Sequence, residues 1–279
     1  MAGSSIKLIV SDIDGTLLPD GCDAHGRSRD GAGVADGIQE LAALIRERNL
    51  PFTLESGRPL SMIRPLADVL GVTLPVVASN GAAAADFHAV YWQEFLNTQL
   101  LRPAIELADA LQLAVIWTDG MDEWVYRENN YTRRHAARNG EWSKCKRPGR
   151  EADWEAWKLQ KLLIIDPASP GKTDEVIRAI EARPDSNAEI IRYDDRGIEV
   201  MPKGCTKGTG LRRLAAQLGI PLPQVMAIGD NKNDLHLFAE AGVSAAVANA
   251  SDVLKEKADY VSRGTSVYGV IEAIRRLAT

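Results

Sequence analysis

The sequence predicts an α/β fold, a Rossmann-like doubly wound parallel sheet with an inserted α+β cap domain. At both ends of the chain, short apolar runs that stop at Asp, Ser, Asn or Gly alternate with segments of helical spacing. The middle has a different pattern, and all six tryptophans lie in it. We therefore expect residues 1–83 and 202–279 to form the core and residues 84–201 to form the insertion.

The first half of the predicted core contains three strands and two helices. The run IKLIV, residues 6–10, is typical of a buried strand, and apolar spacing predicts a helix over 34–48. The stretch PFTLESGRP predicts a strand that ends near Ser56, and Pro59 suits the first turn of the next helix. LPVVASNGA predicts a third strand with a turn at Asn80.

The second half of the core resumes this alternation. Apolar spacing predicts a helix through 211–218, then QVMAIGDNKND and GVSAAVANA each predict a strand and loop, and residues 267–277 predict a closing helix. Strand-like runs in the insertion are LAVIWT, EWVYR, KLQKLLIID, EIIRYD and GIEVMP. Helical patterns separate them, which favours an α+β arrangement there.

Composition narrows the class of protein. A chain of 279 residues with 45% hydrophobic and 25% charged residues can bury a substantial core. The net charge of −5 disfavours a general nucleic-acid binder, and no apolar run approaches the roughly 18 residues of a membrane span. The start lacks a signal-peptide pattern, and three scattered cysteines suit a reducing compartment. We expect a cytoplasmic monomer or homodimer without nucleic-acid or membrane partners.

Polar side chains gather at the predicted ends of the strands. In open parallel sheets, ligands bind beyond the carboxyl ends of the strands, so these residues are expected to line one crevice. They are Asp12, Asp14, Ser56, Gly57, Asn80, Asp230, Asn233 and Asp234, together with Lys207 at the start of a helix.

This set of residues suits phosphoryl transfer. Carboxylates in close proximity repel unless a divalent cation neutralises them, and oxygen ligands favour Mg²⁺. A lysine and a hydroxyl supply hydrogen-bond donors for phosphate oxygens. One aspartate can act as a nucleophile, and another can protonate the leaving oxygen and later activate water.

Four stretches then indicate a family. DIDGTLL, ESGRP, GCTKGTGL and GDNKND resemble, in order, the four motifs of the haloacid dehalogenase superfamily. The length of the insertion resembles the large α+β cap, of the C2 type, in the Cof-type phosphatases. The resemblance covers most of residues 6–83 and 203–271, and the insertion only in outline.

The resemblance implies a role for each matching residue. Asp12 would be the nucleophile and Asp14 the general acid and base. Ser56 and Lys207 would hold the transferring phosphoryl group, with Gly57 beside it and Asn80 at the mouth of the site. Ligands of Mg²⁺ would come from Asp12, the backbone carbonyl of Asp14 and Asp230, supported by Asn233 and Asp234. The expected enzyme is a Mg²⁺-dependent phosphomonoesterase acting on a small phosphorylated metabolite, with sugar phosphates the leading class.

Several residues leave alternatives open. Asn80 is as well suited to a turn with Gly81 as to substrate contact, and Asn233 could cap a helix. We expect Arg58 to hold the loop or the helix start. Glu55 replaces the small or apolar residue usual in the second motif; in a regular strand it points away from Ser56, whereas a bulge would turn it toward phosphate.

Two other functions use the same residues. A phosphomutase of sugar phosphates would share the core but return the phosphoryl group to its substrate. A non-catalytic protein that binds a phosphorylated metabolite would not need the general acid. The insertion contains a basic segment over 133–150. Our first interpretation is that it forms a solvated charged face, and the alternative is that part of it closes over the active site and selects a second anionic group of the substrate.

Overall fold

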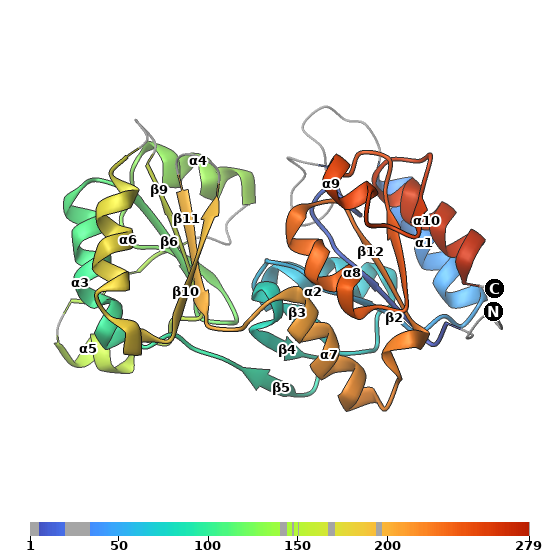
Figure 1. Cartoon of the computed structure of the whole chain (residues 1–279), viewed down its shortest axis with the longest axis horizontal. Helices are drawn as coiled ribbons and strands as arrows, with labels where there is room; N and C mark the ends of the chain where they lie inside the picture. The colour runs from blue at the N-terminus through green and yellow to red at the C-terminus, as the bar shows by residue number, and fades with distance from the viewer. Residues whose placement is uncertain are drawn as a thin grey trace. The chain divides into compact units, whose positions relative to one another are not determined.

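The computed structural model divides the chain into two compact units (Figure 1). It describes residues 6–19, 34–139, 144–146, 148–149, 151–166, 171–193 and 197–278. The core unit comprises Met1–Trp92 and Thr206–Thr279, and the inserted unit comprises Gln93–Cys205. The predicted insertion of residues 84–201 therefore begins and ends earlier in the chain than this unit.

The core unit is built on a five-stranded parallel sheet. Its strands, in spatial order, are β14 (Tyr260–Val261), β13 (Val243–Ala246), β12 (Val225–Gly229), β1 (Leu8–Ser11) and β2 (Phe52–Leu54). β1 and β12, distant in sequence, pair directly at the middle. Strands β1, β2 and β12 are buried throughout, which explains their uninterrupted apolar runs.

Two groups of helices cover this sheet (Figure 1). In one group α1 packs against α2 and α10, and in the other α7 packs against α8. The chain winds outward from β1 in both directions, and right-handed crossovers then place the groups on opposite faces. This confirms the predicted doubly wound fold. The helices are α1 (Ala35–Glu47), α2 (Leu60–Leu70), α7 (Lys207–Leu218), α8 (Leu235–Glu240), α9 (Asp252–Lys255) and α10 (Ser266–Leu277).

A small second sheet extends the core unit beyond the predicted boundary at residue 84. It contains β3 (Val76–Ala78), β4 (Ala83–Ala85) and β5 (Val90–Gln93). The indole of Trp92 is buried and donates a hydrogen bond to the carbonyl of Gly81 at 3.0 Å. The Arg213 guanidinium, from α7, lies 4.6 Å from the centre of the same ring. These contacts join the hairpin to the core.

The inserted unit is an α+β domain with its own hydrophobic core. Its sheet has the order β10-β11-β9-β6-β7-β8, and Trp117, Trp154 and Trp157 lie in the buried cluster beside it. The strands are β6 (Ala114–Thr118), β7 (Glu123–Val125), β8 (Lys144–Cys145), β9 (Lys161–Ile165), β10 (Ala188–Tyr193) and β11 (Gly197–Pro202). The helices are α3 (Thr98–Ala110), α4 (Asn130–Asn139), α5 (Glu151–Ala156) and α6 (Thr173–Glu181).

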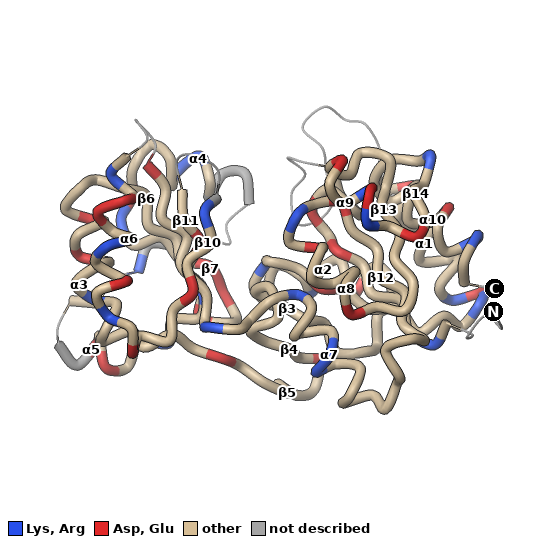
Figure 2. Tube along the Cα trace, viewed as in Figure 1, with Lys and Arg blue, Asp and Glu red and all other residues tan. Residues whose placement is uncertain are grey.

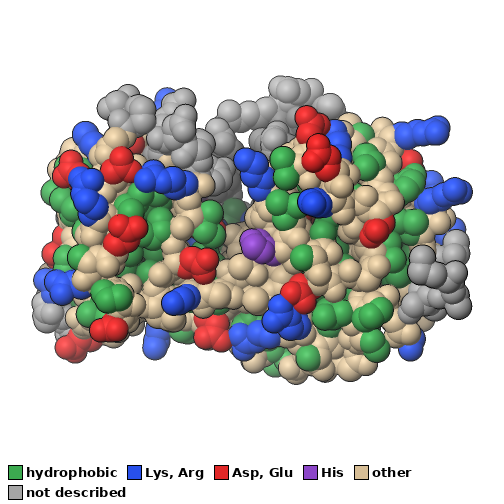
Figure 3. All heavy atoms as spheres, in the orientation of Figure 1, with side chains coloured by type: hydrophobic (Ala, Val, Ile, Leu, Met, Phe, Trp, Pro, Cys, Tyr) green, Lys and Arg blue, Asp and Glu red, His purple; other side chains and the backbone are tan. Residues whose placement is uncertain are grey.

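Charged residues of both signs are interspersed along the backbone of each unit (Figure 2), and charged side chains of both signs are interspersed over the face drawn in Figure 3. None of the helices in the described ranges combines the length and the apolar composition that crossing a bilayer requires. Part of the basic segment over 133–150, namely residues 140–143, 147 and 150, lies outside the described residues, as does the glycine-rich stretch over 22–33.

Candidate active site

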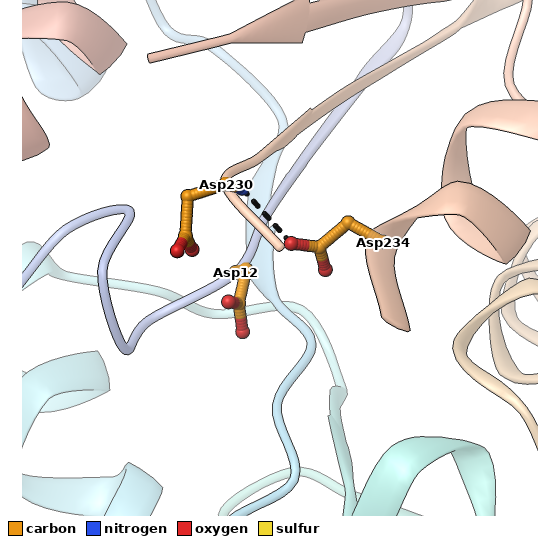
Figure 4. Close-up of side chains that lie close together, drawn as sticks. All are labelled: Asp12, Asp230 and Asp234. Carbon is orange, nitrogen blue, oxygen red and sulfur yellow. Dashed lines mark hydrogen bonds between the residues drawn. The ribbon is translucent and has the colours of Figure 1, made fainter. Parts of the chain in front are cut away.

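The candidate site lies where the strand order of the core sheet reverses, between β1 and β12. Asp12 directly follows β1 and Asp230 directly follows β12, and these two strands are neighbours. The backbone N–H of Asp12 donates to the carbonyl of Ile228 at 3.0 Å. The pairing of β1 with β12 therefore continues as far as Asp12. Ligands of open α/β folds bind at this switch point. The carboxylates of Asp12, Asp230 and Asp234 converge there (Figure 4).

A buried lysine lies between two of these carboxylates. Lys207 Nζ is 2.7 Å from Asp12 Oδ1 and 2.5 Å from Asp234 Oδ1, and all three side chains are almost fully buried. Burial by itself lowers the pKa of Lys207, but the two carboxylates outweigh it and raise that pKa above its usual value. Lys207 is therefore a fixed cation beside the carboxylate of Asp12.

The start of α7 holds Lys207 in this position. Thr206 caps the helix: its hydroxyl accepts a hydrogen bond from the N–H of Thr209, and the hydroxyl of Thr209 accepts one from the N–H of Thr206. Lys207 is the first helical residue, as predicted. Gly81 lies so close that a Cβ there would come within 2.2 Å of the carbonyl oxygen of Thr206. Backbone packing therefore sets the place of the lysine.

Asp234 organises the loop after β12. Its Oδ1 accepts from Lys207, and its Oδ2 accepts from the backbone N–H groups of Asp230, at 2.9 Å, and Asn231, at 3.0 Å. With both oxygens engaged, Asp234 is better suited to hold the lysine and the loop than to bind a metal directly. Asn233, the residue before it, is exposed.

Asp230 is oriented by a residue that the sequence analysis did not single out. Thr16 is fully buried, and its hydroxyl donates to Asp230 Oδ1 at 2.7 Å. Gly15 has φ +85°, and a Cβ there would lie 2.2 Å from Asp230 Oδ2. The Asn249 amide supports this turn by donating to the Gly15 carbonyl at 2.8 Å. Gly15 and Thr16 belong to the motif DIDGTLL, which contains the signal that could have identified them.

The oxygen atoms present fit a hard divalent cation. Asp12, Asp230 and Asp234 each offer one carboxylate oxygen, and these atoms lie within 4.8 Å of one another. Burial raises the pKa of Asp12 well above its usual value; Lys207 opposes this, and the neighbouring carboxylates add to it. A cation would favour the ionised form of Asp12, which is the form that a nucleophile needs.

Ser56, Arg58 and Asp14 form the other side of the site. Ser56 is buried at the end of β2, and its Oγ accepts a hydrogen bond of 3.2 Å from the backbone N–H of Arg58. The guanidinium of Arg58 binds both oxygens of Asp14, with Nε 2.8 Å from Oδ2 and Nη2 2.6 Å from Oδ1. Arg58 thus contacts Asp14 as well as the loop, which the sequence analysis did not anticipate.

Asn80 and Gly57 lie together beside this loop. The N–H of Asn80 donates to the carbonyl of Ser56 at 3.0 Å, and Asn80 adopts a left-handed conformation with φ 50°. A Cβ on Gly57 would lie 3.2 Å from Asn80 Oδ1, so the two residues are neighbours. The turn role considered for Asn80 is present, and its half-buried side chain adjoins Gly57.

Glu55 is the least expected residue near the site. Its side chain is fully buried, and neither carboxyl oxygen has a hydrogen-bond partner among the described residues. A Cβ added to Gly210, on α7, would lie 2.4 Å from Glu55 Oε1, so the carboxyl packs against that helix. Desolvation raises the pKa of Glu55 well above its usual value, with Lys207 opposing and Asp234 and Asp12 adding to the rise. Burial of Glu55 therefore favours its neutral form over its ionised form.

Comparison with known proteins identifies the family of this chain. The profile of the haloacid dehalogenase-like hydrolases matches residues 9–274. The chain is 27% identical to 5-amino-6-(5-phospho-D-ribitylamino)uracil phosphatase YcsE of Bacillus subtilis, over 97% of this chain and 95% of that protein. It is also 27% identical to a phosphoglycolate phosphatase of Aeropyrum pernix, over 99% of this chain and 95% of that one.

A solved structure shows the same fold. The crystal structure of a haloacid dehalogenase-like hydrolase from Bacteroides thetaiotaomicron matches with a TM-score of 0.80 at 26% identity, covering 97% of this chain and 99% of that one. The family expected from the four motifs, and with it an enzyme, is thereby confirmed. With the profile matching nearly its whole length, this chain belongs to the haloacid dehalogenase-like hydrolases.

Proposed function

We propose that this protein is a Mg²⁺-dependent phosphatase that hydrolyses a small phosphorylated metabolite through a phosphorylated Asp12. The observation that carries the proposal is the contact of 2.7 Å between Asp12 and the buried Lys207. A nucleophile of this kind needs a fixed cation beside it to receive the charge of a phosphoryl group. The phosphatase names of the full-length relatives support the same reaction.

In the first step, a carboxylate oxygen of Asp12 attacks phosphorus and the bond from phosphorus to the ester oxygen breaks. Asp14 gives its proton to the departing oxygen, and the product alcohol leaves. Lys207 Nζ balances the charge on the phosphoryl oxygens. The hydroxyl of Ser56 accepts from the Arg58 N–H, so its own proton is available for a phosphoryl oxygen.

In the second step, water attacks the phosphorus of the aspartyl phosphate. The bond between phosphorus and Asp12 breaks, Asp14 takes the proton from water, and inorganic phosphate leaves. Asp12 and Asp230, with the backbone carbonyl of Asp14 that the family resemblance adds, would hold Mg²⁺. When bound, the cation would neutralise the carboxylates and withdraw charge from the phosphoryl oxygens.

The proposed substrates are small polyol and sugar phosphates. The two named relatives act, by their names, on a phosphoribityl compound and on phosphoglycolate, which are phosphate esters of short carbon chains. The inserted unit is proposed to contain the residues that select among such esters, since the core motifs account for the phosphoryl group alone.

The test is phosphate release from a panel of sugar, polyol and short-chain acid phosphates, with Mg²⁺ or with a chelator. We expect release that requires the metal and that falls at least about 10³-fold in Asp12→Asn, which retains the shape but not the nucleophile. Isomerised sugar phosphate in place of free phosphate would mean a phosphomutase. Undiminished release by Asp12→Asn would contradict the proposed nucleophile.

A further inference from the structure

The contact between Arg58 and Asp14 joins a buried cation to an exposed acid. The side chain of Arg58 is 9% exposed, whereas that of Asp14 is 53% exposed. An exposed aspartate ordinarily samples several rotamers. Here Nε and Nη2 bind the two carboxylate oxygens in parallel, and this forked geometry fixes the plane of the carboxyl group as well as its position.

The backbone of Arg58 is fixed on both sides. Its N–H donates to Ser56 Oγ at 3.2 Å, and its carbonyl accepts from the N–H of Ser79 at 2.9 Å. The next residue, Pro59, is the cap at the start of α2. The guanidinium therefore extends from a well-anchored point, and one residue contacts both the proposed phosphate-binding hydroxyl and the proposed acid.

We propose that Arg58 is a positioning residue: it holds the Asp14 carboxyl group so that the proton of Asp14 reaches the leaving oxygen of the substrate. The proposal rests on the function proposed above. Each Asp14 oxygen keeps a second lone-pair direction after binding Arg58, so proton transfer can occur without breaking the pair. The P–O(ester) bond breaks, and the proton moves from Asp14 to that ester oxygen, which leaves as an alcohol.

This role predicts a dependence on the leaving group. An alkoxide is a poor leaving group and needs the proton of Asp14, whereas p-nitrophenolate leaves without one. Displacement of a catalytic group by about 1 Å costs on the order of 10²-fold in rate. Loss of Arg58 should therefore slow the hydrolysis of alkyl phosphates much more than that of p-nitrophenyl phosphate.

The experiment measures kcat/KM of the full chain for p-nitrophenyl phosphate and for the alkyl phosphate that the wild type hydrolyses best. kcat/KM covers the steps through release of the first product, which include proton donation. The variants are Arg58→Lys, Arg58→Met, Asp14→Asn and the double variant Asp14→Asn/Arg58→Met. Arg58→Lys keeps the positive charge but loses the two parallel N–H donors that bind the Asp14 carboxylate. Arg64→Lys and Arg64→Met, at an exposed position of α2, are the matched controls.

We expect both Arg58 variants to lower the alkyl value about 10- to 100-fold more than the aryl value, and the controls to lower neither. Once Asp14 is replaced, removing Arg58 should not change the ratio of alkyl to aryl values further. Far-UV circular dichroism and melting curves establish that each variant folds, and Arg58→Lys provides the test if Arg58→Met does not.

Other outcomes overturn the proposal. Equal losses on both substrates would mean that Arg58 only supports the fold. An equal rise of KM on both would mean that it binds the phosphoryl group instead. If the wild type hydrolyses neither ester, the proposed function fails and this inference fails with it, whereas failure of the inference alone leaves wild-type hydrolysis intact.

Discussion

Glu55 is a buried carboxyl group whose ionisation is disfavoured by burial. Because its pKa in the folded protein lies well above 4.5, the neutral form adds stability below the unfolded pKa, and this contribution is lost as pH rises through the folded pKa. At high pH, each unit by which the folded pKa of Glu55 exceeds its unfolded pKa lowers the free energy of unfolding by about 1.4 kcal/mol. Glu55→Gln cannot ionise, so its free energy of unfolding should fall less than that of the wild type between pH 5 and pH 8.

Urea unfolding at these two pH values measures the difference. Glu47→Gln, at an exposed position of α1, is the control and should follow the wild type. An equal pH dependence in Glu55→Gln and wild type would mean that the Glu55 carboxyl is ionised in the folded protein. Its place against α7 would then require a partner for the charge.

Thr16 provides a second prediction at this scale. It orients Asp230 through one hydrogen bond, and loss of such an outer contact commonly weakens metal binding 10- to 100-fold. Thr16→Val should therefore raise the Kd for Mg²⁺ by about that factor in a calorimetric titration. Thr53→Val removes a similar buried hydroxyl, one that donates to the carbonyl of Pro75, and should leave the Kd unchanged. Equal effects of the two substitutions would count against the role of Thr16.

The proximity of those residues in the candidate site that directly follow strand ends was predictable from the sequence. Asp12 and Asp230 each come after an apolar strand, and Lys207 begins a helix, so general rules of parallel sheets brought them together. The contacts of Arg58 with Asp14 and of Thr16 with Asp230 could not be predicted in this way. They join residues 44 and 214 positions apart, through side chains whose direction depends on the path of two loops.

At the scale of elements, the first turn of α7 is packed too closely for side chains at its glycines. A Cβ on Gly210 would lie 2.4 Å from Glu55 Oε1 and 2.8 Å from the Cα of Gly81. Alanine favours helices over glycine by about 1 kcal/mol, but here its methyl group has no room. Gly210→Ala should therefore destabilise the protein by about 1–3 kcal/mol in urea unfolding, and its displacement of α7 should also lower kcat through Lys207.

Gln217→Ala, on an exposed position of the same helix, serves as the comparison. Alanine has a helix propensity equal to or higher than that of glutamine. Because the Gln217 side chain is exposed, Gln217→Ala should change the free energy of unfolding by no more than about 0.5 kcal/mol. If Gly210→Ala were as stable as Gln217→Ala, the contact between α7 and the β3–β4 turn would be looser than the distances indicate.

The elements that the sequence analysis missed lack a local signal. β4 is a run of alanines, which have low strand propensity, and its pairing with β3 decides its conformation. The predicted boundary at residue 84 cut through this strand for that reason. By contrast β1, β12 and α1 have strong apolar patterns of the correct period, and their structure agrees with the prediction to within two residues.

At the scale of the whole molecule, the chain leaves the core unit after Trp92 and returns to it at Thr206. Strands and helices alternate in the sequence both before and after the inserted unit, and this made it predictable that two separate segments form one core. Within that core, the segment from Asp12 to Thr16 and the segment from Asp230 to Asp234 bring three carboxylates together, and two of them, Asp12 and Asp230, are the proposed metal ligands. The inserted unit has a separate hydrophobic core, so metal binding should act on the stability of only part of the chain.

This division gives a prediction for metal binding that does not depend on catalysis. A ligand that binds only the folded state stabilises it by RT ln(1 + [L]/Kd), about 2.7 kcal/mol when [L] is 100 times Kd. Saturating Mg²⁺ should therefore raise the melting temperature of the core unit. It should also slow amide hydrogen exchange in peptides covering residues 8–18 and 225–235 more than in those covering β6 and β9.

Asp230→Asn tests whether the carboxylates are responsible. It keeps a side chain that can accept the hydrogen bond from Thr16 but removes one negative charge, so the shift in melting temperature and the added protection should both largely disappear. Without Mg²⁺ the variant should melt at or above the wild-type temperature, because one of three mutually repelling carboxylates is gone. If Asp230→Asn and the wild type responded equally to Mg²⁺, the cation would bind somewhere other than the carboxylates at this sheet edge. The ion pair of Asp12 with Lys207 would then have to support catalysis without a metal at this edge.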